Sequence, residues 1–266
     1  MFEILKYDFM IKALIAGVFL SIAITSIGVF VVLKRYSIIA DTLSHVSLNG
    51  LILGAVIKIN PLLSAVLVAI GASVLFEKIR SSKKVYADSI LTIFLTAGLA
   101  LAVLLISTLR NLNLNLTNLL FGSILTISTE DLIIIGFVTT LVIISILLFY
   151  KKFFSLCFDE DFEKAMGTNI SFYNYLLVIL AGLSIGISIQ IIGVLLISGL
   201  MVIPVVSAFQ FKMGFKLSYF IAIFFSLFAT ISGLVISFTA GIPSGAAIVL
   251  VSVAIFALSF VINYKK

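Results

Sequence analysis

An aspartate and the only histidine of the chain, Asp41 and His45, stand four residues apart in a strongly apolar sequence. On a helix this spacing places both side chains on one face, one turn apart. A carboxylate oxygen and an imidazole nitrogen suit borderline divalent transition-metal ions, and two ligands leave coordination positions open, so that an ion can depart again. The pair therefore predicts a transient metal-binding site with Asp41 and His45 as ligands.

A less specific interpretation of the same pair is that Asp41 and His45 only hydrogen-bond to each other or to nearby backbone and fix helix packing. The metal interpretation is favoured because a carboxylate at the centre of a bilayer costs about 2.5 to 3.5 kcal/mol unless it faces water, a cation or a bundle interior. The chain has one histidine, so any further ligands must come from other helices.

The elements that position this pair are those of an all-α polytopic membrane protein. Of the 266 residues, 62% are hydrophobic and 11% are charged, and the mean hydropathy is +1.35. Apolar runs of about 20 residues recur along the chain. The polar stretches between them are too short to bury a core of their own. Residues 1–266 are therefore expected to form a single transmembrane domain.

Nine membrane spans are expected, together with one shorter helix. The segment 116–128 is too short to cross at about 1.5 Å per residue, and we expect a re-entrant or pore-lining helix there. The nine spans are placed near residues 10–33, 37–57, 61–76, 89–109, 131–150, 172–189, 191–210, 217–238 and 245–262.

The basic residues predict the orientation of these spans. With nine crossings, thirteen of the 17 lysines and arginines fall on one side of the membrane, so the positive-inside rule places the carboxyl terminus in the cytoplasm and the amino terminus outside. The net charge of +6 is then explained by the orientation of the spans and by contact with anionic lipid, and it does not indicate nucleic-acid binding. The thirteen are Lys34, Arg35, Lys78, Arg80, Lys83, Lys84, Lys151, Lys152, Lys164, Lys212, Lys216, Lys265 and Lys266.

The longest inward loop, about 151–173, contains a run that has the pattern of a short amphipathic helix. Acidic residues open the run at Asp159 and a glycine, Gly167, closes it. Taken alone, such a run could be a solvated loop helix whose acids are favoured by the helix dipole.

Five segments of the chain stand out by their order and spacing: GVFVVLKRYS (28–37), DTLSHVSLNG (41–50), LFGS (120–123), GVLLISGLMVIPVVSA (193–208) and PSGAAIVL (243–250). In these segments the chain resembles the zinc-uptake type family of permeases, the integral membrane subunits of bacterial ABC importers for zinc, manganese and iron. The resemblance covers nearly the whole chain, and the family's metal-pathway positions match Asp41 and His45. In one departure, Gly241 stands where the family often has an acidic residue.

The resemblance implies a type II-like ABC importer permease in the bacterial plasma membrane. Such a permease works as a homodimer, with a separate ABC ATPase subunit and an extracytoplasmic metal-binding protein. The chain itself has no Walker-type loop, so it is not expected to be an enzyme, and it is expected to hold no cofactor besides the transported zinc, manganese or iron. The helix in the inward loop would be the coupling helix. Its expected ATPase-contacting residues are Asp161, Phe162, Glu163, Ala165, Met166 and Gly167, with Phe162 and Met166 as the apolar face.

Two other classes of function remain open. An autonomous ion- or proton-coupled secondary metal carrier would use Asp41 and His45 as a proton relay and would need no ATPase. An intramembrane enzyme is disfavoured, because the sequence has no HExxH helix and no glycine-rich nucleophile elbow. One aspartate and one histidine do not distinguish zinc, manganese and ferrous iron.

Overall fold

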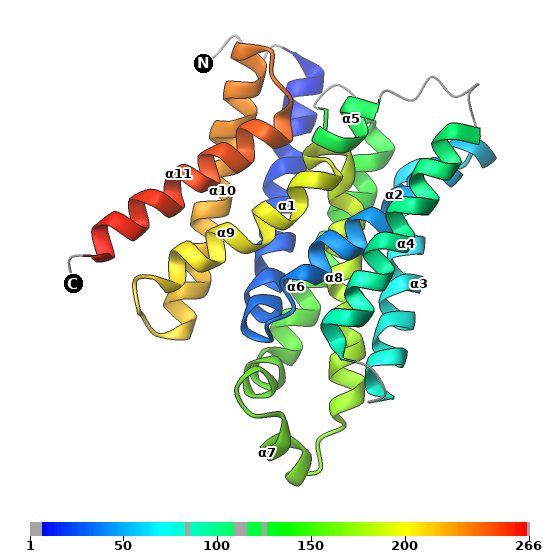
Figure 1. The fold of residues 1–266 in the computed structure, drawn as a ribbon. Coiled ribbons are helices and arrows are strands. Elements are labelled where there is room, and N and C mark those ends of the chain that lie inside the picture. Colours follow the sequence, from blue (N-terminus) through cyan, green and yellow to red (C-terminus); the bar gives the residue numbers. More distant parts are fainter. Residues whose placement is uncertain (1–6, 83–85, 109–115, 124–126, 265–266) are drawn as a thin grey trace.

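The computed structural model describes residues 7–82, 86–108, 116–123 and 127–264, which form α-helices joined by short turns (Figure 1). The helices are α1 (Asp8–Leu33), α2 (Ile38–Ile57), α3 (Pro61–Ser81), α4 (Ala87–Thr108), α5 (Leu116–Phe121), α6 (Thr129–Phe158), α7 (Glu160–Ala165), α8 (Ile170–Ile192), the 3-10 helix η2 (Val194–Leu196), α9 (Ile197–Phe209), α10 (Phe215–Ala240) and α11 (Ser244–Tyr264).

Eight helices of the described ranges are long and apolar enough to cross a membrane: α1, α2, α3, α4, α6, α8, α10 and α11. These confirm eight of the predicted spans. The remaining one, predicted at 191–210, is shorter and consists of η2 and α9, Val194–Phe209. It reaches about 25 Å, somewhat less than the hydrocarbon layer of about 30 Å. The reason is that α8 continues to Ile192 and the chain turns only at Gly193.

Three predicted boundaries differ from the structure by five residues or more. The short helix expected at 116–128 is the six-residue α5, and residues 124–126 lie outside the described ranges. Helix α3 extends to Ser81 instead of ending near residue 76, and α6 extends to Phe158 instead of ending near residue 150. Both extensions carry charged residues, which lower the hydropathy without breaking a helix that continues beyond the membrane.

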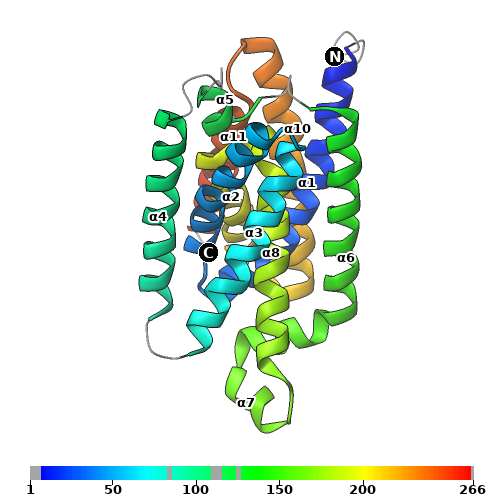
Figure 2. The ribbon, with the colours of Figure 1, turned by 90° about the vertical axis from the view of Figure 1, so that its right-hand side faces the viewer.

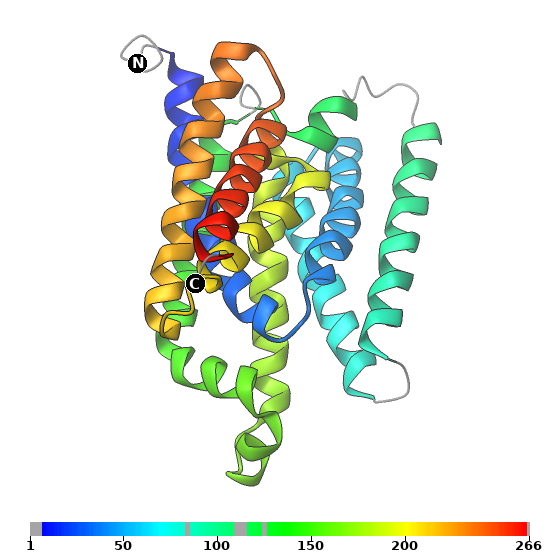
Figure 3. The same ribbon diagram turned by 60° about the vertical axis from the view of Figure 1, so that its left-hand side comes forward.

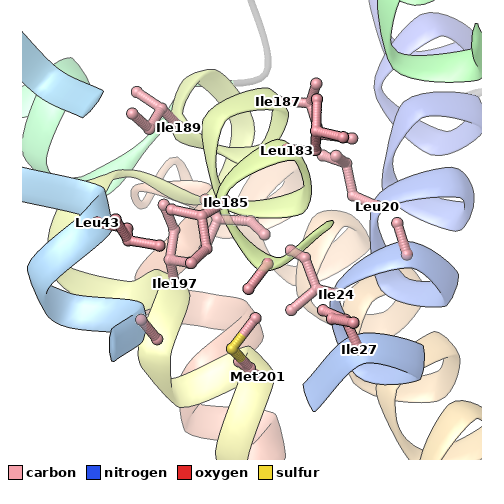
Figure 4. Packing of buried hydrophobic residues seen from close by; sticks show 14 of the residues in the cluster. Leu20, Ile24, Ile27, Leu43, Leu183, Ile185, Ile187, Ile189, Ile197 and Met201 are labelled. Atoms are coloured by element: carbon pink, nitrogen blue, oxygen red, sulfur yellow. The ribbon is translucent and has the colours of Figure 1, made fainter. Parts of the chain in front are cut away.

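Helices α1, α2 and α8 are the most buried spans and form the centre of the molecule. Helix α1 packs against α6, α8, α9 and α10, while α2 lies between α3 and α4. Figure 2 shows α4 and α6 at opposite edges, and Figure 3 shows α10 and α11 away from α4. Figure 4 shows core side chains from α1, α2, α8 and α9: Leu20, Ile24, Ile27, Leu43, Leu183, Ile185, Ile187, Ile189, Ile197 and Met201.

A close contact between three segments closes the end of the bundle that carries α5. Gly193 ends α8 at φ 80° and ψ 154°, a conformation that is costly for any residue with a side chain. Gly245, in the first turn of α11, lies against the carbonyl oxygens of Ile192 and Phe121. The hydroxyl of Ser244 donates to the carbonyl oxygen of Ile191 at 2.6 Å. The contact therefore joins α5, the α8–η2 turn and the start of α11.

Candidate metal-binding residues and coupling helix

Helix α2 carries both predicted metal ligands. It begins at Ile38, directly after the short turn that follows α1, and places Asp41 in its first turn. The next turn carries His45, whose side chain is 7% exposed, whereas Asp41 is half-buried. As predicted from the spacing, the two side chains belong to one helix and are separated by a rise of about 6 Å.

Both side chains keep coordinating atoms free. The carboxylate of Asp41 makes no hydrogen bond or ion pair with the part of the chain that the structure describes, although its backbone carbonyl accepts from Ser44 Oγ at 2.8 Å. The Nδ1 atom of His45 is buried and has no hydrogen-bond partner there either. Buried polar atoms of folded proteins nearly always have partners, so the Nδ1 atom of His45 is available for a ligand. The half-buried carboxylate of Asp41 is open to the same ligand.

Other buried acids show what a structural carboxylate looks like in this fold. Glu77, the residue after the span predicted at 61–76, is 0% exposed within α3. Its carboxylate accepts from Arg80 Nε and Nη2 at 2.7 and 2.6 Å. Asp131 is 4% exposed and accepts from Asn60 Nδ2 at 3.2 Å and from the backbone N–H of Ser128 at 3.0 Å. Asp41 differs from both because its carboxylate has no such donor.

One copy of the chain supplies few metal ligands. Within the described ranges, no group of three or more histidine, cysteine, aspartate or glutamate side chains could hold a metal ion. Gly241, where the resemblance would allow an acid, is exposed and ends α10 with φ +65°. The two side chains of α2 are thus the strongest ligand pair that the described part of the chain offers.

The predicted short helix of the inward loop is present as α7, which projects beyond the ends of the neighbouring helices (Figures 1 and 2). Asp159 caps it by accepting from the backbone N–H of Phe162 at 2.8 Å. Gly167 follows its last turn with φ +78°, and its N–H donates to the carbonyl of Lys164 at 3.0 Å. The predicted helix and its closing glycine are confirmed.

The predicted coupling residues divide between two faces of this loop. Phe162 and Met166 are 58% and 69% exposed, so they form the apolar outer face that the sequence suggests. Asp161, Ala165 and Gly167 are exposed as well. Glu163 instead points inward and is 7% exposed.

Glu163 fastens α7 to α6 and to the loop before α8. Its carboxylate accepts from Lys152 Nζ at 2.9 Å and from Thr168 Oγ1 at 2.5 Å. Hydrogen bonds from Thr168, Ser155 and Lys152 lower the pKa of Glu163 from its ordinary 4.5 to about 2. The ionised form therefore holds α7 in place.

A second anchor lies at the first residue of α7, and no local sequence pattern indicates it. Glu160 lies 3.7 Å from the amine of Lys34, at the end of α1, and accepts from Asn174 Nδ2 of α8 at 2.9 Å. Lys34 also donates to Asn174 Oδ1. Burial lowers the pKa of the Lys34 amine, although the carboxylate of Glu160 opposes this shift. We call Lys34, Glu160 and Asn174 the inner triad.

A family comparison identifies the class of this membrane protein. Residues 6–263 match the model of the ABC 3 transport family. The chain belongs to the ABC 3 transport family.

Curated relatives and a solved structure are similar to nearly the whole chain. The zinc uptake membrane protein ZnuB of Haemophilus influenzae is 32% identical over 253 residues, covering 95% of this chain and 97% of that protein. The manganese import permease ScaB of Streptococcus gordonii is 30% identical over 260 residues, covering 98% and 93%. The structure of PsaBC from Streptococcus pneumoniae in complex with Fab has a TM-score of 0.86 at 28% identity, covering 97% of this chain and 92% of that one.

As an ABC permease, the chain is a multi-span subunit of the bacterial inner membrane, and ATP hydrolysis belongs to a separate subunit. The autonomous carrier considered from the sequence is not favoured by this family membership.

The lowered pKa of Glu163 predicts a pH-dependent stability for the ABC permease. An acid whose pKa is depressed on folding stabilises the fold above its unfolded pKa and loses this contribution as the pH falls toward the folded value. We therefore expect the melting temperature of the wild type to exceed that of Glu163→Gln by a constant amount above about pH 5. This difference should narrow as the pH falls from 4.5 toward 2. Thermal unfolding of the purified chain in detergent measures it.

The donor Lys152 provides a companion variant for this measurement. Lys152→Met removes one of the hydrogen bonds that lower the pKa of Glu163, so in that background the narrowing should still begin near pH 4.5 but end at a higher pH. The lowered pKa of Glu163 would be contradicted if the melting temperatures of wild type and Glu163→Gln differed by the same amount down to pH values near the folded pKa.

Proposed function

We propose that this chain is the permease of an ATP-driven importer that carries a divalent transition-metal ion into the cytoplasm. It would act as a homodimer that binds ABC ATPase subunits and receives the ion from an extracytoplasmic binding protein. The observation that carries the proposal is the unpartnered pair of Asp41 and His45 on a central helix of an ABC permease. Relatives named for zinc uptake and manganese import support the substrate class.

Asp41 and His45 would provide the transient site on the pathway. The ionised carboxylate attracts a cation, and the neutral imidazole supplies a nitrogen ligand. A homodimer brings two copies of the pair, so that the ligand number could rise to four when the two α2 helices face each other. Zinc, manganese and ferrous iron all fit such a mixed set, and we favour zinc or manganese because of the relatives.

The face that carries α7 would point into the cytoplasm, with the amino terminus outside and the carboxyl terminus inside. Phe162 and Met166 would enter a groove of the ATPase, and Asp161, Ala165 and Gly167 would surround them. A cavity of about 410 Å³ beside α7, lined at the inner ends of α3 and α8, offers room for an ATPase side chain.

The inner triad would transmit movement of α7 to the metal site. Glu160 belongs to α7, Lys34 ends α1, and α2 begins four residues after Lys34. A displacement of α7 is thus passed by an ion pair and two hydrogen bonds to the turn that leads to Asp41.

Replacing Lys34 with Met should loosen this connection. We expect ATP hydrolysis by the assembled transporter to continue while metal uptake per ATP falls about three- to tenfold, since coupling changes of 0.5 to 2 kcal/mol are typical of such positions. The exposed Lys151 of α6 offers a control, because Lys151→Met removes a cation without touching the triad or the cavity beside α7. Equal ratios of ions to ATP in both variants would contradict transmission through Lys34.

The proposed function is tested by uptake of zinc, manganese and iron into proteoliposomes that contain this chain, its ATPase and its binding protein. We expect uptake of at least one metal that requires ATP and an ATPase with an intact Walker motif. Equal uptake with a Walker-lysine variant of the ATPase would support an autonomous carrier instead. Absence of uptake for all three metals by a complex that hydrolyses ATP would refute the substrate class.

A further inference from the structure

Asn49 lies one helical turn beyond His45 on α2 and is 6% exposed. Its Nδ2 atom donates to two backbone carbonyl oxygens, that of His45 at 3.2 Å and that of Gly98 in α4 at 3.0 Å. These contacts fix the side chain on the turn of α2 that also carries His45.

The two carbonyls also decide which way the amide of Asn49 is turned. A reversed amide would bring Oδ1 against two carbonyl oxygens and lose both hydrogen bonds, so Oδ1 must face away from them. In this orientation Oδ1 is buried and has no hydrogen-bond partner among the described residues. A buried acceptor without a partner loses its hydrogen bonds to water and gains none in return, which calls for a ligand.

Close packing of α4 on α2 holds the amide in this orientation. A Cβ atom at Gly98 would lie 3.0 Å from Val46 Cγ2 and 3.3 Å from the carbonyl carbon of His45. The absence of a side chain at Gly98 therefore lets its carbonyl oxygen come within hydrogen-bonding distance of Asn49. The geometry resembles the preorganisation of a ligand, with both N–H groups engaged and the oxygen free.

Other unpartnered polar atoms lack this arrangement. Gln190 and Gln210 also have buried amide oxygens without partners, but both residues are only half-buried and stand at or beside helix ends. Asn49 lies within its helix, one turn from His45 and two turns from Asp41. Among the described residues, neither the Nδ1 atom of His45 nor the carboxylate of Asp41 has a hydrogen-bond partner. The three form a ladder of coordinating atoms with a rise of about 6 Å per step.

We propose that Asn49 Oδ1 is a further ligand of the permeating cation, one step to the outer side of His45, and that it favours the harder ions among divalent metals. This inference rests on the proposed function, including the direction of α2. A neutral amide oxygen is a hard ligand that suits manganese(II) better than zinc(II), whereas imidazole suits zinc(II) well. Asn49 passes an entering ion to His45 and Asp41, and it adds affinity without adding charge.

The test compares Asn49→Leu with Thr42→Val in the assembled transporter, with binding protein loaded with manganese(II) or zinc(II). Leucine has nearly the shape of asparagine but no oxygen. Thr42 is the matched control, because it also lies on α2 and donates to a carbonyl of α4, that of Leu91 at 3.2 Å. We expect Asn49→Leu to lower the initial rate of manganese uptake about tenfold and that of zinc about threefold, while Thr42→Val stays within about twofold for both.

Two outcomes would overturn the proposal. Equal losses of uptake in Asn49→Leu and Thr42→Val would mean that Asn49 only packs against α4. Equal losses of manganese and zinc uptake in Asn49→Leu would show that Asn49 does not favour harder ions. If Asn49→Leu does not fold, Asn49→Gln keeps the amide and moves its oxygen by one methylene. An unchanged ratio of manganese to zinc uptake in that variant would count against the proposal in the same way.

Asp41→Asn distinguishes a failure of this inference from a failure of the proposed function. If Asp41→Asn abolishes uptake and Asn49→Leu behaves as wild type, the pathway holds and only the role of Asn49 is refuted. If Asp41→Asn retains full uptake, the pathway along α2 itself is refuted.

Discussion

Asp41→Asn is expected to reduce metal uptake about 100-fold without impairing the fold. Asparagine keeps the shape of the side chain and removes its charge. Two opposite unit charges about 4 Å apart attract each other by about 4 kcal/mol at an effective dielectric constant of 20, and a divalent ion is attracted more strongly. The cost of removing water from the carboxylate and the ion opposes this attraction. A net loss of about 2.7 kcal/mol of interaction free energy corresponds to a 100-fold lower uptake rate. Initial uptake rates in proteoliposomes measure the effect.

Asp88 provides the control for this substitution. It lies in the first turn of α4, as Asp41 lies in the first turn of α2, but it is exposed. Asp88→Asn should therefore leave uptake within about twofold of wild type, since an exposed surface charge contributes little. The folded chain carrying Asp41→Asn should be as stable as wild type or slightly more so, because the carboxylate it loses has no partner in the described structure. Uptake by Asp41→Asn equal to that by Asp88→Asn would exclude Asp41 from the pathway.

Much of the fold follows from the sequence because a membrane limits the choices. A run that is apolar on every face and about 20 residues long has little alternative to a spanning helix. For the same reason the sequence predicts that Asp41 and His45 lie on one face, since residues four apart on such a helix share a face. The short α7 was predictable from its capping aspartate and its closing glycine.

The helix ends and the inner triad were not predictable from local pattern. Hydropathy falls at Glu77, so the apolar run that predicts the span ends there. Helix α3 continues nevertheless, because Glu77 forms an ion pair with Arg80. The triad joins residues as much as 140 positions apart, and only the packing of α1 against α8 brings them together. The free oxygen of Asn49 likewise depends on a contact with Gly98 in another helix.

The short helix η2 shows how one backbone turn can change a predicted span. The hydropathy of the sequence predicts one apolar span at 191–210, but the turn at Gly193 ends α8 and leaves a shorter element, Val194–Phe209. The segments LFGS, GVLL and PSGA meet at this turn in the structure. Part of the family resemblance thus reflects a packing requirement at the end of the bundle opposite α7.

Gly245→Ala is expected to have the largest effect on stability. The added methyl group would overlap the carbonyl oxygen of Ile192 and approach that of Phe121 to 2.6 Å, and backbone atoms cannot turn aside as a flexible side chain can. Overpacking of this kind costs about 3 kcal/mol or more. The melting temperature of the purified chain should fall by about 6 to 12 °C.

Gly136 of α6 is the matched control, because a Cβ atom there would meet nothing within 4 Å. Gly136→Ala should leave the melting temperature unchanged or raise it slightly, since alanine is the better helix former by about 1 kcal/mol. A melting temperature of Gly245→Ala within about 2 °C of wild type would mean that α11 can shift away from the α8–η2 turn at little cost. That result would require the end of the bundle near α5 to be loosely packed, contrary to the hydrogen bond that Ser244 makes there.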